Sequence, residues 1–191
     1  MSKSRLEAFS DGVIAIVITI MVLELRPPAG GDWDALRSLA HEFSLYVLSF
    51  AFVGIYWNNH HHLLHAAERV NGAILWANLH LLFWLSLVPF VTRWMGENHY
   101  SELPTAVYGG VMLAAAIAYS VLQAAIVRDQ GPQSRLELAV GNDRKGKTSI
   151  AAYVAAIGLA FVSPWLSIAL YALVALMWLV PDRRIESRLP R

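Results

Sequence analysis

The stretch VNGAILWANLHLLFWLSLVPFVT, residues 70–92, runs for 23 positions without a Lys, Arg, Asp or Glu. A helix of about 20 apolar residues is long enough to cross the hydrocarbon core of a bilayer, which is about 30 Å thick. A second uncharged window, residues 103–127, is 25 residues long and meets the same requirement. The sequence therefore predicts a membrane-spanning helix in each window.

The composition of the whole chain agrees with a membrane protein. Of its 191 residues, 57% are hydrophobic and 15% are charged, against about 45–50% and about 25% in an average soluble domain. The net charge is only +1, which gives no general attraction to nucleic acid. The chain has no cysteine, and this excludes disulfides, thiolate metal sites and a cysteine nucleophile. At this length we expect one domain, residues 1–191.

Two further uncharged windows need more than length to interpret. Residues 43–62 are uncharged and end in three histidines, so we expect a helix whose last turn lies at an interface. Residues 148–181 are uncharged for 34 positions, which as one helix would measure about 51 Å. Ser163-Pro164 supplies a break, because proline removes a backbone donor and disfavours helix at the preceding residue. We expect two short helices, 148–163 and 165–181.

The first apolar run is unusually short, with twelve uncharged residues between Asp11 and Glu24. A secretory signal peptide is one interpretation, since basic residues precede the run. It is disfavoured by the acidic Glu7 and Asp11 and by Arg26-Pro27-Pro28 where a small-residue cleavage site is needed. We instead expect a helix over residues 4–25 that carries charges at or near membrane depth, which must be paired or face water.

These segments predict an all-α membrane protein with six spans. With the N-terminus in the cytoplasm, twelve of the fifteen Lys and Arg lie on the inner side, as the positive-inside rule requires. Both termini are then cytoplasmic, in a multi-pass protein of the cell membrane. Residues 128–147 are expected to form a cytoplasmic loop, and residues 32–42 a short amphipathic helix on the outer face, capped by Asp32 or Asp34.

Four residues of the first helix share one face, because Ile16, Thr19, Ile20 and Leu23 follow i, i+3, i+4, i+7 spacing. In a segment this apolar, the stripe can be an ordinary packing face. Alternatively, copies of the face surround a symmetry axis. A ring of Ile16 would then form a dry constriction, and Thr19 hydroxyls would offer oxygens to a partly dehydrated cation. Spacing alone leaves both interpretations open.

The histidines suggest a function of a different class. His60, His61, His62 and His65 include i, i+3 and i, i+4 spacings that suit a metal. A membrane metalloenzyme or a proton-coupled small-solute carrier is therefore the alternative hypothesis. Against a metal, no carboxylate accompanies the cluster except Glu68 beyond it, and consecutive rings point in different directions around a helix. We expect hydrogen bonding at the interface and no bound metal, with a pH effect on activity as a minor possibility.

Several motifs in the first half of the chain resemble a known family. Residues 5–11, RLEAFSD, match the R-x-x-x-F-S-D signature of helix 1 in the transmembrane protein 175 potassium channels. YWNNHH at 56–61, Trp76-x-Asn78 and SLVPF at 86–90 are similar to patterns on helices 2 and 3 of the bacterial six-span branch. The resemblance covers about the first 95 residues, and the later helices match only in number and hydropathy.

This resemblance implies a homotetramer in the bilayer whose first helices line a central pore that passes K⁺ in preference to Na⁺. It implies no enzyme activity, no cofactor and no nucleic-acid partner. The hydrophobic bottleneck falls on Ile16, with Thr19 beyond it and Leu23 as a further apolar layer, while Ile20 faces either the pore or a neighbouring helix. No T-V-G-Y-G-like segment is present, in keeping with a channel that lacks a carbonyl filter.

The signature residues are interpreted as a scaffold for the first helix. Arg5 and Asp11 are six residues apart, which is poor spacing for a pair on one helix, so each is expected to find partners on other helices. We expect this network to fix the tilt and rotation of the first helix. Its predicted members are Arg5, Phe9, Ser10, Asp11, Trp57, His60, His61 and Asn78.

Overall fold

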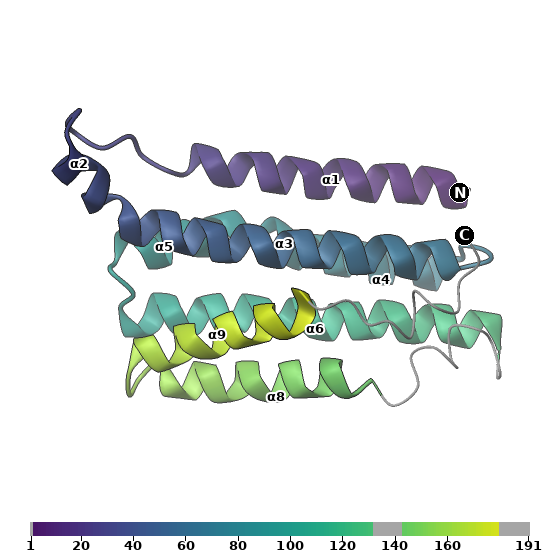
Figure 1. Ribbon diagram of the computed structural model, residues 1–191. Helices are drawn as coiled ribbons and strands as arrows, with labels where there is room; N and C mark the ends of the chain where they lie inside the picture. Colours follow the sequence, from purple (N-terminus) through teal and green to yellow (C-terminus); the bar gives the residue numbers. More distant parts are fainter. Residues whose placement is uncertain (1, 132–142, 180–191) are drawn as a thin grey trace.

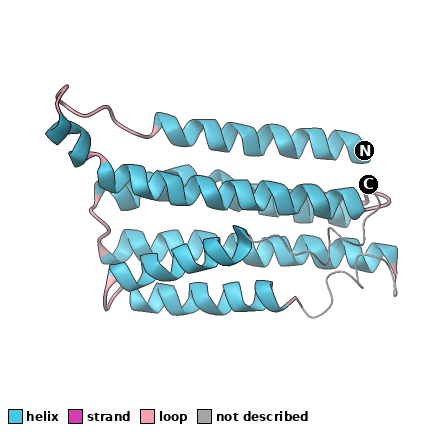
Figure 2. Cartoon of the chain, viewed as in Figure 1, coloured by secondary structure: helices cyan, strands magenta, loops and turns pink. Residues whose placement is uncertain are grey.

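The computed structural model describes residues 2–131 and 143–179, and all the regular secondary structure in these ranges is helical (Figure 2). The helices are α1 (Lys3–Leu23), α2 (Trp33–Ser38), α3 (Ala40–Ala66), α4 (Gly72–Ser86), α5 (Val88–Glu97), α6 (Glu102–Gln130), α8 (Arg144–Leu159) and α9 (Pro164–Leu179).

The long helices lie side by side in layers, with α1 at one edge of the bundle (Figure 1). The helix α1 packs against α3, α4 and α5. The helix α6 forms the next layer, in contact with α4, α5, α8 and α9. This order leaves one side of α1 without a neighbour among the described helices.

Three segments of the described chain are long and apolar enough to cross a bilayer: Lys3–Leu23, Gly72–Glu97 and Glu102–Gln130. The helix α9 is apolar but shorter. The chain is thus a multi-pass membrane protein. The predicted span 70–92 coincides with the second segment, but this segment consists of two helices that meet at Leu87. Pro89, in the first turn of α5, explains the break, because proline has no N–H to continue the helix before it.

The long uncharged window 148–181 is divided as the sequence predicts. The helix α8 ends at Leu159 and α9 begins at Pro164. The predicted loop 128–147 is shorter in the structure, because α6 continues to Gln130 and α8 begins at Arg144. Gly131, with φ of 81°, ends α6, and Asp143 caps α8 by accepting a hydrogen bond from the Gly146 amide at 3.0 Å. Residues 132–142 lie outside the described residues.

Tyrosines and a glycine bring α6, α8 and α9 together. Tyr108, Tyr153 and Tyr171 are fully buried, and the Tyr171 hydroxyl donates to the Thr105 carbonyl at 3.0 Å. A Cβ atom at Gly109 would collide with the Tyr171 hydroxyl. Glycine at this position therefore permits the close approach of α6 and α9.

The short helix α2, in the connection between α1 and α3, begins where the sequence predicts. The Asp32 carboxylate accepts a hydrogen bond from the Ala35 amide at 2.8 Å and so caps α2. The helix ends at Ser38, and α3 starts at Ala40, earlier than the predicted 43.

Candidate functional site: the exposed face of α1 and its polar supports

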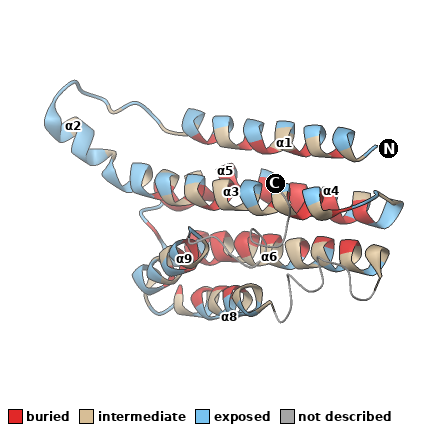
Figure 3. Cartoon of the chain, turned by 45° about the vertical axis from the view of Figure 1, so that its right-hand side comes forward, coloured by how far each residue is buried: buried red, intermediate tan, exposed pale blue. Residues whose placement is uncertain are grey.

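The helix α1 has one buried face and one exposed face (Figure 3). The buried face packs on the rest of the chain and consists of Leu6, Ser10, Ile14, Val17 and Met21. The opposite face carries the four residues of the predicted stripe: Ile16, Thr19, Ile20 and Leu23. Ile16 is 58% exposed and Leu23 is 79% exposed. Within residues 2–131 and 143–179, no helix covers this stripe, so its two interpretations are distinguished only by what lies outside the described chain.

Thr19 is the polar member of the exposed face. Its hydroxyl donates to the Ile16 carbonyl of the same helix at 3.0 Å. This bond uses the single hydroxyl hydrogen and fixes the side-chain oxygen, whose lone pairs accept no hydrogen bond within the described residues. Thr19 thus presents an oriented oxygen acceptor between apolar neighbours.

An open groove lies beside the exposed face, between α1 and the α4–α5 segment. Ile16 and Ile20 line one wall, and Pro89 and Phe90 line the other. Phe90 is 60% exposed, and its ring stacks on Trp94 with centroids 6.0 Å apart. The uncovered apolar surface therefore continues from α1 onto α5.

Behind the exposed face, a buried chain of hydrogen bonds links α1 to α4 and α3. The Asn78 amide nitrogen donates to the Ser10 hydroxyl oxygen at 2.9 Å, and the Ser10 hydroxyl donates to the Leu6 carbonyl at 2.9 Å. On its other side, Asn78 Oδ1 lies 2.6 Å from His60 Nε2, which supplies the proton. Ser10, Asn78 and His60 are all buried. Three helices are thus joined through one asparagine.

A second contact joins the next residue of α1 to α3. The Trp57 indole Nε1 donates to Asp11 Oδ1 at 3.0 Å. Asp11 and Ser10 are adjacent, so this bond and the buried chain hold the same turn of α1. Two neighbouring residues of α1 are therefore hydrogen-bonded to two different helices, α3 and α4.

The other predicted members of the network lie elsewhere. Arg5 is exposed and forms no hydrogen bond or ion pair within residues 2–131 and 143–179. Phe9 is half exposed and belongs to the uncovered face of α1. His61 makes ring contacts with Trp57 and stacks on His65, with centroids 6.2 Å apart, but contributes no hydrogen bond to the network. The structure therefore brings together five of the eight predicted residues: Ser10, Asp11, Trp57, His60 and Asn78.

The histidine cluster does not converge on one point. His60 turns into the interior toward Asn78, while the His61 ring contacts the rings of His62 and His65. Within the described part of the chain, no group of three or more His, Cys, Asp or Glu side chains is arranged to hold a metal ion.

Two contacts at the Lys3 end of the bundle were not predicted. Lys3 Nζ donates to the His65 carbonyl at 2.6 Å and so ties the start of α1 to the end of α3. Arg69, in the α3–α4 connection, donates through Nε to Asp129 Oδ2 at 2.9 Å. This hydrogen bond raises the pKa of the Arg69 guanidinium. Asn71 also donates to Asp129, at 2.8 Å, so the connection is attached to the end of α6.

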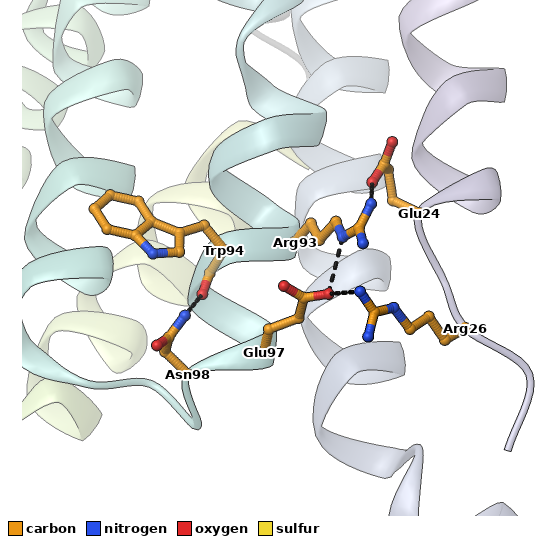
Figure 4. A network of polar contacts seen from close by, with 6 residues as sticks. All are labelled: Glu24, Arg26, Arg93, Trp94, Glu97 and Asn98. Atoms are coloured by element: carbon orange, nitrogen blue, oxygen red, sulfur yellow. Dashed lines mark hydrogen bonds and ion pairs between the residues drawn. The ribbon is translucent and has the colours of Figure 1, made fainter. Parts of the chain in front are cut away.

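A further network lies at the Leu23 end of α1 and joins it to α5 (Figure 4). Arg93 donates to Glu24 Oε2 through Nη1 at 2.6 Å and to Glu97 Oε1 through Nε at 3.0 Å. Arg26 Nη2 lies 2.9 Å from the same Glu97 oxygen. Sequence reasoning missed this network. The i, i+4 spacing of Arg93 and Glu97 was visible, but no pattern connected them to Glu24, which lies 69 positions earlier.

Known proteins resemble the whole chain. A family model described as "Endosomal/lysosomal potassium channel TMEM175" matches residues 5–89. A potassium channel from Chryseobacterium sp. (strain P1-3) is 52% identical over 99% of this chain and 98% of its own. A potassium channel from Streptomyces collinus is 34% identical over 92% of this chain and 91% of its own.

The fold also matches a solved structure. It is a crystal structure of a lysosomal potassium-selective channel TMEM175 homolog from Chamaesiphon minutus, with a TM-score of 0.84 and 30% identity over 94% of this chain and 97% of that one. Full-length identity at this level, the family-model match and the shared fold all point to one family. The chain is a member of the TMEM175 family.

Proposed function

We propose that this chain is the subunit of a potassium-selective channel through which ions pass passively. The observation that carries the proposal is the exposed face of α1, where an oriented threonine hydroxyl lies between large apolar side chains on a helix long enough to span a membrane. The names of the full-length relatives, which are potassium channels, support it.

The proposed assembly is a homotetramer with α1 of each subunit around a central axis. Each subunit would cross the cell membrane six times, with the Lys3 end of α1 in the cytoplasm and both termini on that side. The uncovered stripe supports this arrangement, because α1 packs on its own chain through the opposite face.

In this assembly, four Ile16 side chains form the narrowest point. A narrow ring without polar groups loses its water readily, so it controls passage through the cost of dehydrating the ion. Thr19 lies about 4.5 Å further along the helix axis, and its oxygen is free to accept a partly dehydrated cation. Leu23 adds a second apolar layer. Ile20, at 40% exposure, is shared between the pore and the groove beside α5. The electrochemical gradient drives the flow, and the proposed mechanism uses K⁺ as the permeant ion with no cofactor.

The polar supports explain how the constriction keeps its geometry. Ser10 and Asp11 are held by Asn78 and Trp57, about one and a half turns from Ile16. We propose that these bonds set the rotation of α1 and therefore direct Ile16 toward the axis.

The alternative function, a metalloenzyme or proton-coupled carrier built on the histidines, has less support. His60 is committed to Asn78, and the relatives that match over the full length are named as channels.

A flux assay tests the proposal. Purified protein in liposomes under a potassium gradient is expected to pass K⁺ faster than Na⁺, and empty liposomes provide the baseline. Ile16→Asn should change the rate or the K⁺/Na⁺ ratio. Leu173→Asn is the matched control, because it places the same polar group on an equally exposed apolar position, at 59%, on α9. Equal behaviour of both variants, or no potassium flux from the assembled wild type, would refute the proposal.

A further inference from the structure

Among the described residues, the polar contacts that hold α1 to other helices lie in its first half, from Lys3 to Asp11, and just beyond its last residue, at Glu24. Toward the Lys3 end they are formed by Lys3, Ser10 and Asp11. Between Asp11 and Glu24 the side chains are apolar except Thr19, whose hydroxyl bonds within α1. In this middle part, packing of the buried stripe holds the helix.

At the Leu23 end, two contacts join α1 and the residues after it to α5. The first joins Glu24, which directly follows the last residue of α1, to Arg93 at 2.6 Å. The second joins Arg26 to Glu97 at 2.9 Å. Arg93 also bonds Glu97, so acidic and basic groups alternate in one continuous network (Figure 4).

Arg93 is the member that holds α1 most firmly. Exposed ion pairs contribute little, because water screens them, and the Arg26 side chain is 73% exposed. The Arg93 side chain is 37% exposed and its partner Glu24 is 30% exposed. Arg93 uses two different nitrogens for two carboxylates, which fixes the guanidinium plane. Its positive charge also lies at the C-terminal end of α1, where the helix dipole favours a cation.

The position of this network decides which layer of the α1 face it controls. With the turn at Asp11 held by Trp57, α1 can tilt about that point. Leu23 lies about 18 Å from it and Ile16 about 7.5 Å. A tilt of about 5° would move Leu23 by about 1.6 Å and Ile16 by about 0.7 Å. Release of the Leu23 end therefore displaces the Leu23 layer more than twice as far as the Ile16 layer.

We infer that Arg93 is a positioning residue for the conduction pathway: by bridging Glu24 and Glu97, it fixes the Leu23 end of α1 and so sets the width of the Leu23 layer. This inference rests on the proposed function, since it takes the exposed face of α1 as the pore wall.

Flux measurements compare Arg93→Gln with Arg37→Gln. Arg37 pairs with Asp34 on α2, with both side chains more than 80% exposed, so its removal deletes the same charge without touching α1. Arg93→Gln is expected to keep the tetramer by size exclusion and to change the potassium flux at least threefold, with the K⁺/Na⁺ ratio within twofold of wild type. Arg93→Lys keeps the charge but offers one nitrogen in place of the two that bridge the carboxylates, and should give an intermediate rate. Arg37→Gln should stay within 1.5-fold of wild type.

A second measurement reports the position of α1 without relying on flux. The chain has no native cysteine, so one introduced cysteine carries one spin label per subunit. Val22→Cys places the label on an exposed position near the Leu23 end, and Val162→Cys places it on the distant α8–α9 turn. When each label is combined with Arg93→Gln, the distribution of distances between the labels of different subunits should broaden at position 22. The distribution at position 162 should stay unchanged.

An assembled Arg93→Gln protein with wild-type flux and wild-type distances at position 22 would overturn the inference. If Arg93→Gln does not assemble, Glu24→Gln makes the same test, because it removes the ion pair from the α1 side and leaves the Arg93–Glu97 pair in place. The outcome is separable from that of the proposed function. If Ile16→Asn leaves conduction unchanged while the distances at position 22 broaden, then the pore proposal fails and the role of Arg93 in holding α1 stands.

Discussion

Replacing Asn78 with leucine should destabilise the protein through the groups it leaves behind. Asn78→Leu keeps the approximate volume of the side chain and removes both of its hydrogen bonds, to Ser10 at 2.9 Å and to His60 at 2.6 Å. Ser10 keeps its bond to the Leu6 carbonyl. His60 Nε2 is buried and loses its partner, so the main cost falls on this nitrogen.

The expected magnitude follows from these two losses. An interhelical hydrogen bond in a membrane protein contributes on average about 0.6 kcal/mol and at most about 1.7 kcal/mol. A buried polar group left without a partner costs about 1–3 kcal/mol. We therefore expect Asn78→Leu to lower the free energy of unfolding by about 2–4 kcal/mol. His60→Phe should cost a similar amount, because it strands Asn78 Oδ1 in the same way.

The double variant is the decisive case. With both partners replaced by apolar groups, no stranded atom remains between positions 60 and 78, so the loss should fall short of the sum of the single losses by at least 1 kcal/mol. The assay is reversible unfolding in mixed micelles at fixed protein concentration, followed by tryptophan fluorescence. Asn59→Leu is the matched control, because within the described residues the Asn59 side chain bonds only the Ile55 carbonyl of its own helix. If the two substitutions are additive within about 0.5 kcal/mol, the reasoning about this network is refuted.

Three further substitutions test other parts of the structure. Gly109→Ala should lower the melting temperature by several degrees, because the new Cβ collides with the Tyr171 hydroxyl; a melting curve identical to wild type would contradict this. Asp11→Asn retains an oxygen acceptor for Trp57 but loses its charge, so it should cost about 1 kcal/mol in the same unfolding assay, and no change in either stability or flux would argue against a role for the pair. Thr19→Val keeps the shape and removes the oxygen, so the K⁺/Na⁺ flux ratio should change at least twofold with assembly intact, whereas an unchanged ratio would exclude the hydroxyl from ion selection.

The sequence predicted the parts of the fold that depend on local pattern. The uncharged windows located the apolar helices, and Pro164 marked the break in the last of them because proline lacks the N–H that would continue the preceding helix and its ring clashes with that helix. The break at Leu87 was missed, although Pro89 carried the same signal, since the window around it had the right length for one span. Gln130 was assigned to a loop because it is polar, but polar residues readily extend a helix beyond the membrane boundary.

The same limit applies to the candidate site: spacing within one helix was informative, and contacts between helices could not be predicted. Helical spacing predicted that Ile16 and Leu23 share one face of α1, and the family resemblance assigned that face to a pore, but spacing did not predict its exposure. Which polar side chains meet across helices depends on the relative rotation of those helices, which no local pattern records. Arg5 illustrates this limit: it belongs to a shared signature but forms no hydrogen bond or ion pair within the described chain, while Arg93, outside every motif, bonds two carboxylates.

The uncovered stripe of α1 has a consequence for how subunits would find one another. In water, side chains such as Leu23 would drive association strongly, but lipid tails solvate them about as well as a partner helix does, so burial of the stripe supplies little net free energy in a bilayer. Association must then depend on close packing and is governed by mass action. The fraction of subunits present as complete channels is expected to rise steeply with the density of the protein in the membrane, so the level of expression itself would regulate conduction.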